Sequence, residues 1–194
     1  MKRLVTFFLT SLLTLTLAAC GGNENSADSN SSNDQNSVKS SLELLTTVWS
    51  SYEDNDKFPA AGGDMSEENM TMDGPGKFSI DDTAALDATL GFPAASAERI
   101  DDAASLVHMM NANTFTCGAF HVKNAGDIAD ISTAIRDNIM QRQWMCGFPD
   151  KLVIVQVDDY IISFFGEKEI VDTFKTKLNA AYTSAETICD DPIA

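Results

Sequence analysis

Two neighbouring runs of β-branched and aromatic residues constrain the fold of this chain more than any other segment. The runs cover residues 151–157 and 160–165, and only Asp158-Asp159 separates them. Alternate residues of a strand face opposite sides, and a two-residue connection joins antiparallel neighbours. The pattern therefore predicts a β-hairpin with one wholly apolar face, formed by Val153, Val155, Val157, Tyr160, Ile162 and Phe164.

The opposite face of this hairpin is mixed in character. It carries Leu152, Ile154, Gln156, Ile161, Ser163 and Phe165. Because two of these side chains are polar, we expect this face to be partly exposed to solvent. The apolar face is the one expected to meet the helices.

Two amphipathic helices are predicted around the hairpin. Asn124 is a suitable N-cap for the first, which has an isoleucine stripe at Ile128, Ile131, Ile135 and Ile139. The second has apolar residues at Ile170, Phe174, Leu178 and Ala181, and it follows Gly166. Both patterns fit a helix with one buried side.

A second hairpin is favoured over residues 103–122, although residues 103–110 fit both helical and strand periods. The turn-like Asn111-Ala112-Asn113 and the β-rich run 114–122 favour strands. Residues 187–189 are expected to add a short edge strand. The order from residue 103 is then β-β-α-β-β-α.

The predicted fold class is α+β, with an antiparallel sheet of about four strands and helices packed on one face. One or two helices precede this ββαββα core. Ser40 and Glu43 form a capping box for the first, and Asp81 or Asp82 caps a short helix that ends at Gly91. Residues 58–79 show no clear period and are expected to be irregular and exposed.

The N-terminus has the layout of an export signal. Lys2 and Arg3 precede a short apolar stretch, residues 4–17, and small residues follow. Leu17-Ala18-Ala19-Cys20 resembles the bacterial lipobox, which implies cleavage after residue 19 and a diacylglyceryl thioether on Cys20. Acylation of the new N-terminus, for example with palmitate, would complete an anchor in the cell membrane on its extracytoplasmic face.

Residues 20–40 are expected to be a disordered polar tether, and residues 41–194 a single folded domain. Twenty flexible residues span on the order of 25 Å. Loss of Lys2 and Arg3 changes the formal net charge from −16 to −18. This acidity excludes nucleic acid as an expected partner, because phosphate contacts need clustered Lys and Arg.

The exported compartment permits disulfides, and Cys117, Cys146 and Cys189 are the candidates. We favour a bond between Cys117 and Cys146, which would close a loop of about 30 residues and stabilise by roughly 3–4 kcal/mol. Pairing of Cys189 with either of them, and free buried thiols, remain open. No C-x-x-C motif is present.

Catalytic and metal signals are weak. The chain has two histidines, His108 and His121. Cys117 and His121 would lie too far apart on one strand to form a catalytic dyad. A catalytic pair of Cys146 with His121 remains an open alternative. Soft ligands suited to copper(I) occur at His108-Met109-Met110, and at Met65 together with Met70-x-Met72. We favour a simpler interpretation, in which residues 109–110 fill the core and residues 65–72 form an irregular loop. Asp54-Asn55-Asp56 lacks the features of a calcium loop. We expect no metal and no cofactor.

Residues 104–182 resemble a family of Gram-positive bacterial lipoproteins known as domain of unknown function 4358. The resembling residues are Met109-Met110-Asn111, 120–125, Asp127, Ile135-Arg136, Gln141-Arg142, 160–162, Ile170 and Phe174. The resemblance implies a lipoprotein signal, a polar linker and this domain. It implies no activity.

The expected function is that of a non-enzymatic lipoprotein outside the membrane that binds an unknown protein or small ligand. Binding would use the mixed face of the sheet or the acidic surface. The alternative is a small lipid-tethered hydrolase or thiol-dependent enzyme that uses Cys146 with a histidine.

Overall fold

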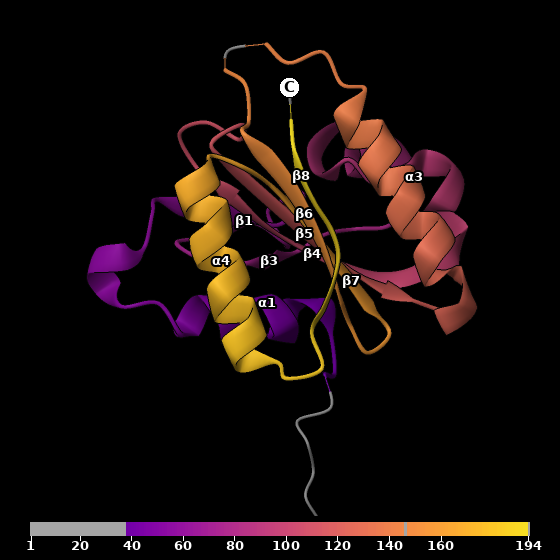
Figure 1. The fold of residues 1–194 in the computed structure, drawn as a ribbon, viewed down its shortest axis with the longest axis horizontal. Helices are drawn as coiled ribbons and strands as arrows, with labels where there is room; N and C mark the ends of the chain where they lie inside the picture. The colour runs from indigo at the N-terminus through magenta and orange to yellow at the C-terminus, as the bar shows by residue number, and fades with distance from the viewer. Residues whose placement is uncertain (1–37, 146, 194) are drawn as a thin grey trace, which may run out of the picture. The chain divides into compact units, whose positions relative to one another are not determined.

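The predicted hairpin of residues 151–165 lies inside an antiparallel sheet in the computed structural model, which describes residues 38–145 and 147–193 (Figure 1). Its strands are β6 (Lys151–Val157) and β7 (Tyr160–Gly166), with Val157 opposite Tyr160. Asp158 adopts a left-handed conformation with φ of 51°, which Asp tolerates better than most residues. The predicted register is confirmed.

The second hairpin is also confirmed. Strands β4 (Ile100–His108) and β5 (Phe115–Val122) are antiparallel, and β5 pairs with β7. Strand β8 (Glu186–Pro192) pairs with β6 and extends the predicted edge strand in both directions. The order across the sheet is β2-β1-β4-β5-β7-β6-β8, with β3 also paired to β4.

The sheet has eight strands rather than the predicted four. The additional strands β1 (Ala60–Gly62), β2 (Thr71–Met72) and β3 (Gly76–Lys77) lie in the segment predicted to be irregular. Their backbones approach so closely that a Cβ on Gly62 would lie 2.1 Å from the Gly76 nitrogen. Glycine at both positions allows this approach.

Helices cover both faces of the sheet, which corrects the prediction of one covered face (Figure 1). On the first face, α1 (Ser41–Ser50) and α4 (Lys168–Ala181) pack on the six predicted apolar residues of the hairpin. On the second face lies α3 (Ile128–Met140), whose predicted isoleucine stripe is buried. The π-helical turn η2 (Leu86–Leu90), which continues α2 (Thr83–Ala85), shares this second core.

The mixed face of the hairpin is therefore buried rather than partly exposed. Leu152, Ile154, Ile161 and Phe165 pack in the same core as the stripe of α3, and Ser163 is buried among them. This face is not available for binding.

The helix caps are local and agree with prediction. The Ser40 hydroxyl accepts a hydrogen bond from the Glu43 N–H, and the Asp82 carboxylate accepts one from the Ala85 N–H. Gly91 has a φ of 73° and ends η2. Three short 3-10 turns complete the chain: η1 (Asp54–Asp56), η3 (Ala94–Arg99) and η4 (Ala125–Asp127), the last capped by Asn124.

Both edges of the sheet are protected against further pairing. Strand β2 has two residues, so it offers little backbone to another strand. Just after β8, the Ile193 N–H donates to the Asp150 carbonyl, so the backbone groups of Ile193 point toward β6. Successive residues of a strand point their N–H and C=O groups to opposite sides, so those of Pro192 point away from the sheet. Proline has no N–H to donate there, and acidic residues such as Asp190 add charge.

The described chain begins at Val38, whose carbonyl accepts a hydrogen bond from the Tyr160 hydroxyl at 3.5 Å. The predicted signal peptide (residues 1–19), Cys20, most of the tether and Cys146 lie outside the described residues. Within the described part, no helix has the length and hydrophobicity needed to cross a bilayer.

Candidate functional site

His121, one of the two candidate catalytic histidines, is paired with a carboxylate. Its Nδ1 lies 2.5 Å from Oδ1 of Asp101, and its ring packs 4.8 Å from the ring of Tyr160. Cys117 lies on the same strand, four residues away, or about 13 Å. Burial raises the pKa of the Cys117 thiol well above its ordinary value. As predicted, these two residues do not form a dyad.

The described residues also give no support to a pair of Cys146 with His121. The neighbours of Cys146 are held at the start of β5, where the Asn113 amide donates to the Met145 and Gly147 carbonyls, each at 3.0 Å. His121 lies near the far end of β5, about 20 Å along the strand from Phe115. Cys146 itself is outside the described residues.

The two described cysteines are on opposite faces of the sheet. Cys117 belongs to the first core and Cys189 to the second, and neither is bonded to another described cysteine. Burial, together with a hydrogen bond to Asp191, raises the pKa of Cys189 to about 11. A bond between Cys117 and Cys189, one of the alternatives left open, is thus not formed. The favoured pairing of Cys117 with Cys146 stays a prediction.

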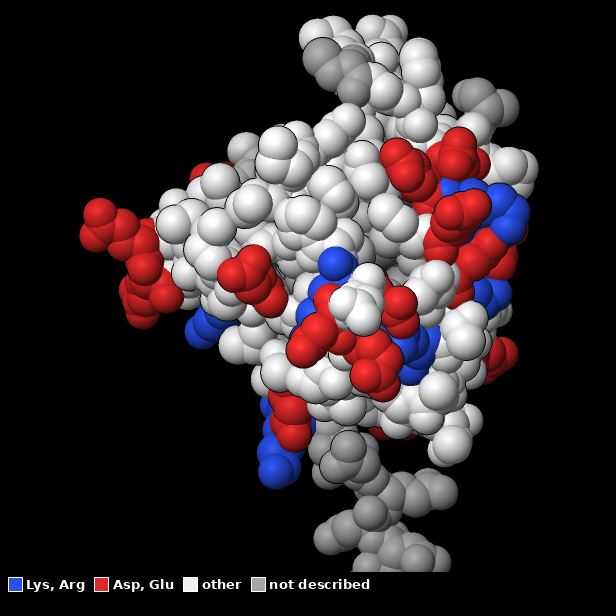
Figure 2. All heavy atoms as spheres, turned by 90° about the vertical axis from the view of Figure 1, so that its left-hand side faces the viewer, with Lys and Arg blue, Asp and Glu red and all other residues white. Residues whose placement is uncertain are grey.

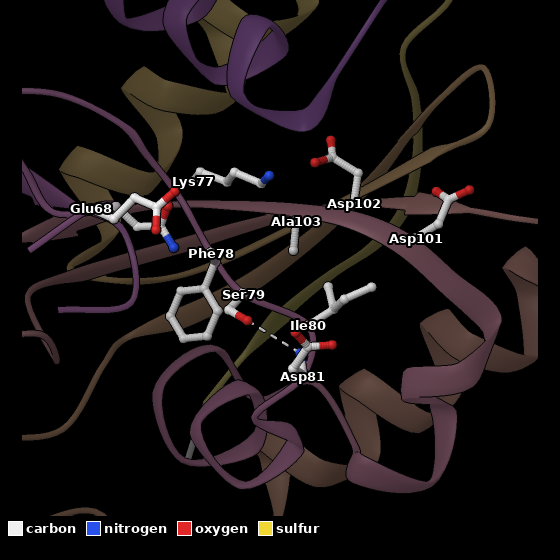
Figure 3. A pocket seen from close by; sticks show the side chains of 10 residues that line it. Glu68, Lys77, Phe78, Ser79, Ile80, Asp81, Asp101, Asp102 and Ala103 are labelled. Carbon is white, nitrogen blue, oxygen red and sulfur yellow. Dashed lines mark hydrogen bonds between the residues drawn. The ribbon is translucent and has the colours of Figure 1, made fainter. Parts of the chain in front are cut away.

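An acidic pocket of about 200 Å³ opens beside the start of β4 (Figure 3). Glu68, Asp81, Asp101 and Asp102 line it, and the Lys77 side chain extends along it toward Asp102 (Figure 3). Two of these carboxylates already have structural roles. Asp101 holds His121, and Asp102 accepts a hydrogen bond of 2.6 Å from the Ser41 N–H at the start of α1.

Within the described residues, no group of three or more His, Cys, Asp or Glu side chains is arranged to hold a metal ion. Asp54 and Asp56 belong to the turn η1, where Asp54 pairs with Lys57 at 3.2 Å.

The most unusual surface lies at the end of the sheet where β4 ends and β5 begins. Four large apolar side chains are exposed there: Met109 (46%), Met110 (76%), Met145 (78%) and Phe148 (74%). We call these four residues the tip surface. Single exposed apolar side chains are ordinary on a protein surface, whereas a group of four on two joined loops requires an explanation.

The tip surface combines two loops that are distant in sequence. Met109 and Met110 follow β4, whereas Met145 and Phe148 lie in the loop between α3 and β6, drawn in orange at the top of Figure 1. The two hydrogen bonds donated by Asn113 join these loops. On the face that Figure 2 shows, no described side chain at the top is charged, in contrast to the acidic surface below.

The tip surface and Val38 lie at opposite ends of β7. Tyr160 begins this strand beside Val38, and Gly166 ends it, followed by Glu167, whose N–H donates to the Thr114 carbonyl at the tip. Seven residues of strand separate the two ends by about 20 Å. The chain therefore enters the domain at one end and presents its apolar loops at the other.

Sequence reasoning missed this surface. Met109 and Met110 were expected to fill the core, but they are exposed because β4 ends at His108. Phe148 was not singled out. A signal was present: residues 103–122 and 143–149 contain no Asp, Glu, Lys or Arg, so both segments bring uncharged loops to the surface of an acidic protein.

Comparisons with protein-family models, curated proteins and solved structures found no match to this chain. The fold and the tip surface define an α+β domain with one exposed apolar end.

Proposed function

We propose that this chain is a lipid-anchored, extracytoplasmic module that binds a protein partner through its tip surface. The observation that carries the proposal is the exposure of four large apolar side chains on two loops joined by Asn113. The largest exposed apolar patch on a monomeric protein is often a functional interaction site. The anchor is supplied by Cys20 through the lipobox, so membrane lipid is the second partner.

The charge distribution favours a protein partner over the membrane. An anionic bilayer attracts Lys and Arg, and residues 109–114 and 143–149, which carry the tip surface, contain neither. The acidic body, at −18 after processing, repels such a bilayer further.

The partner that fits this surface has an uncharged, apolar centre. Methionine side chains are flexible and polarizable, so they adapt to partner side chains of different shape. Phe148 supplies the large, rigid anchor that interface centres favour. Neither nucleic acid nor a cofactor has a role in this function.

Site-specific photo-crosslinking on intact cells tests the proposal. A benzophenone amino acid replaces Met110 or Phe148 in the full chain, and Met65, which has the same 76% exposure as Met110, is the matched control. We expect both tip positions to capture the same protein under ultraviolet light, and the control position to capture none. Equal capture at Met65, or adducts at the tip with lipid alone, would overturn the proposal.

A further inference from the structure

The methionines of this protein are distributed in an unusual way. Methionine is ordinarily among the residue types most often buried. Here six of the seven described methionines are exposed, and the seventh, Met140, is only partly buried. Met65 (76%), Met70 (47%) and Met72 (56%) lie on the β1–β2 hairpin, and the other three belong to the tip surface. The buried parts of both cores are built without methionine.

The described thiols show the opposite arrangement. Cys117 is completely buried and Cys189 is 8% exposed. Burial also keeps both thiols protonated at neutral pH by raising the pKa of each, whereas the thiolate is the form that oxidants attack. Among the described sulfur-containing side chains, an oxidant therefore meets exposed thioethers before it meets either thiol.

We propose that Met109, Met110 and Met145 form a peroxide-modified site, and that their oxidation to sulfoxides releases the partner from the tip surface. This inference rests on the proposed function, because the partner is the one that binds there. The oxidant is hydrogen peroxide, which an exported domain meets without the protection of the reducing cytoplasm.

The chemical step is a transfer of one oxygen atom. A lone pair of the methionine sulfur attacks one oxygen of the peroxide, the O–O bond breaks, and an S–O bond forms. The sulfur loses two electrons to the peroxide, whose second oxygen leaves as water with both protons. No protein base is required, so exposure of the sulfur determines which methionines react.

The product is polar where the partner needs an apolar surface. A sulfoxide is a strong hydrogen-bond acceptor, and burying it against an apolar partner without a donor opposes binding. Three of the four tip side chains change in this way, whereas Phe148 does not react. Because the buried cores lack methionine, the fold tolerates the modification. Methionine sulfoxide reductases, one for each epimer, reverse it at the expense of a thiol reductant.

Two triple variants test the proposal. One replaces Met109, Met110 and Met145 with leucine, and the matched control replaces Met65, Met70 and Met72 with leucine. The parent chain and both variants carry the photoreactive residue at position 148. For each chain, the crosslink yield measured after peroxide treatment is divided by the yield measured without peroxide. We expect at least a tenfold loss in the parent chain and in the hairpin variant, and a ratio near one in the tip variant.

Three accompanying measurements make the result decisive. Peptide mass spectrometry should find sulfoxide at Met110 and Met145, and the Tm of the oxidised parent chain should stay within about 3 °C of the untreated one. Treatment of oxidised membranes with both reductases and dithiothreitol should restore the crosslink. This reductase arm also decides the matter if the tip variant binds too weakly to be followed.

The outcomes separate this inference from the proposed function. Crosslinking without peroxide tests binding alone, and its absence overturns both. Crosslinking that peroxide leaves unchanged overturns the switch and leaves the proposed function intact. If peroxide lowers the crosslink yield of the tip variant as much as that of the parent chain, the oxidised group lies on the partner. If the hairpin variant keeps its crosslink yield under peroxide, the effect belongs to Met65, Met70 and Met72. Either result overturns the switch at the tip.

Discussion

At the scale of single residues, Ser105 shows how one side chain holds a strained turn. Gly63 follows β1 with a φ of 96°, which favours glycine. The Ser105 hydroxyl on β4 accepts a hydrogen bond from the Gly63 N–H at 2.8 Å and donates one to the Gly63 carbonyl at 3.1 Å. Both polar groups of this glycine backbone depend on one buried side chain.

We expect Ser105→Ala to lower the free energy of unfolding by about 2 kcal/mol, because two buried backbone groups lose their partner. Ser163→Ala is the matched control. Ser163 is equally buried on β7, but its hydroxyl has no hydrogen-bond partner among the described residues. Urea unfolding should show a change below about 0.5 kcal/mol for the control. Equal losses in the two variants would contradict this account.

Local residue patterns predicted the caps well, and the contact of Ser105 could not be predicted. The Ser40 and Asp82 caps connect residues three apart, so a short window of sequence contains both partners. Ser105 and Gly63 are 42 residues apart, and only the fold brings them together. The tip surface is of the same kind, since Asn113 meets Met145 and Gly147 across more than 30 residues.

At the scale of elements, charged side chains join α4 to the edge of the sheet. Lys151 on β6 lies 2.7 Å from Asp172 of α4 and 2.7 Å from Asp190 of β8. Lys168 also pairs with Asp172, and Lys175 pairs with Asp190 at 2.8 Å. Hydrogen bonds from Lys151 and Lys168 lower the pKa of Asp172. These pairs fix β8 beneath α4.

The lowered pKa of Asp172 predicts a pH-dependent contribution to stability. The contribution is present above the unfolded pKa of about 3.9 and is lost as the pH falls through the lower folded value. We expect Asp172→Asn to cost about 1 kcal/mol at pH 7, since the site is more than one-third exposed, and almost nothing at pH 2. Urea unfolding at both pH values measures this difference.

Asp54→Asn provides the control for this prediction, because the Asp54 side chain is 99% exposed and pairs only with Lys57. It should leave the free energy of unfolding unchanged at either pH. If Asp172→Asn lowers the free energy of unfolding as much at pH 2 as at pH 7, then packing rather than the charge of this side chain matters at this position.

Elements with a clear period were predicted, and those without one were missed. The hairpin β6–β7, the stripe of α3 and the stripe of α4 follow from alternation or helical spacing. Strands of two or three residues, such as β2 and β3, have no measurable period. The second covered face was misjudged because Gln156 and Ser163 were given more weight than the larger apolar residues around them. Two helices with apolar stripes require two apolar surfaces, and one face of a sheet does not serve both.

At the scale of the whole molecule, the proposed anchor and the acidity of the chain would act together. Removal of Lys2 and Arg3 with the proposed signal peptide would give a net charge of −18, which opposes approach to an anionic bilayer. In this proposal, the lipid on Cys20 is what holds the domain at the membrane. The resemblance to a lipoprotein family is in line with this proposal, and no comparison adds a relative.

Metabolic labelling tests the anchor directly. Cells that express the wild-type chain should incorporate labelled palmitate into this protein, and cells that express Cys20→Ala should not. Equal labelling of the two chains would contradict the lipoprotein assignment.

The protected edges of the sheet have a consequence for how densely such a protein is displayed. The proposed anchor would confine copies to two dimensions, where neighbours collide far more often than they would in bulk solution. An open strand would then act as a template, and chains would polymerise side by side across the cell surface. With Pro192 on the free side of β8 and only two residues in β2, crowded neighbours would find little backbone to pair with. A cell could therefore display many copies as separate molecules, each with its tip surface free.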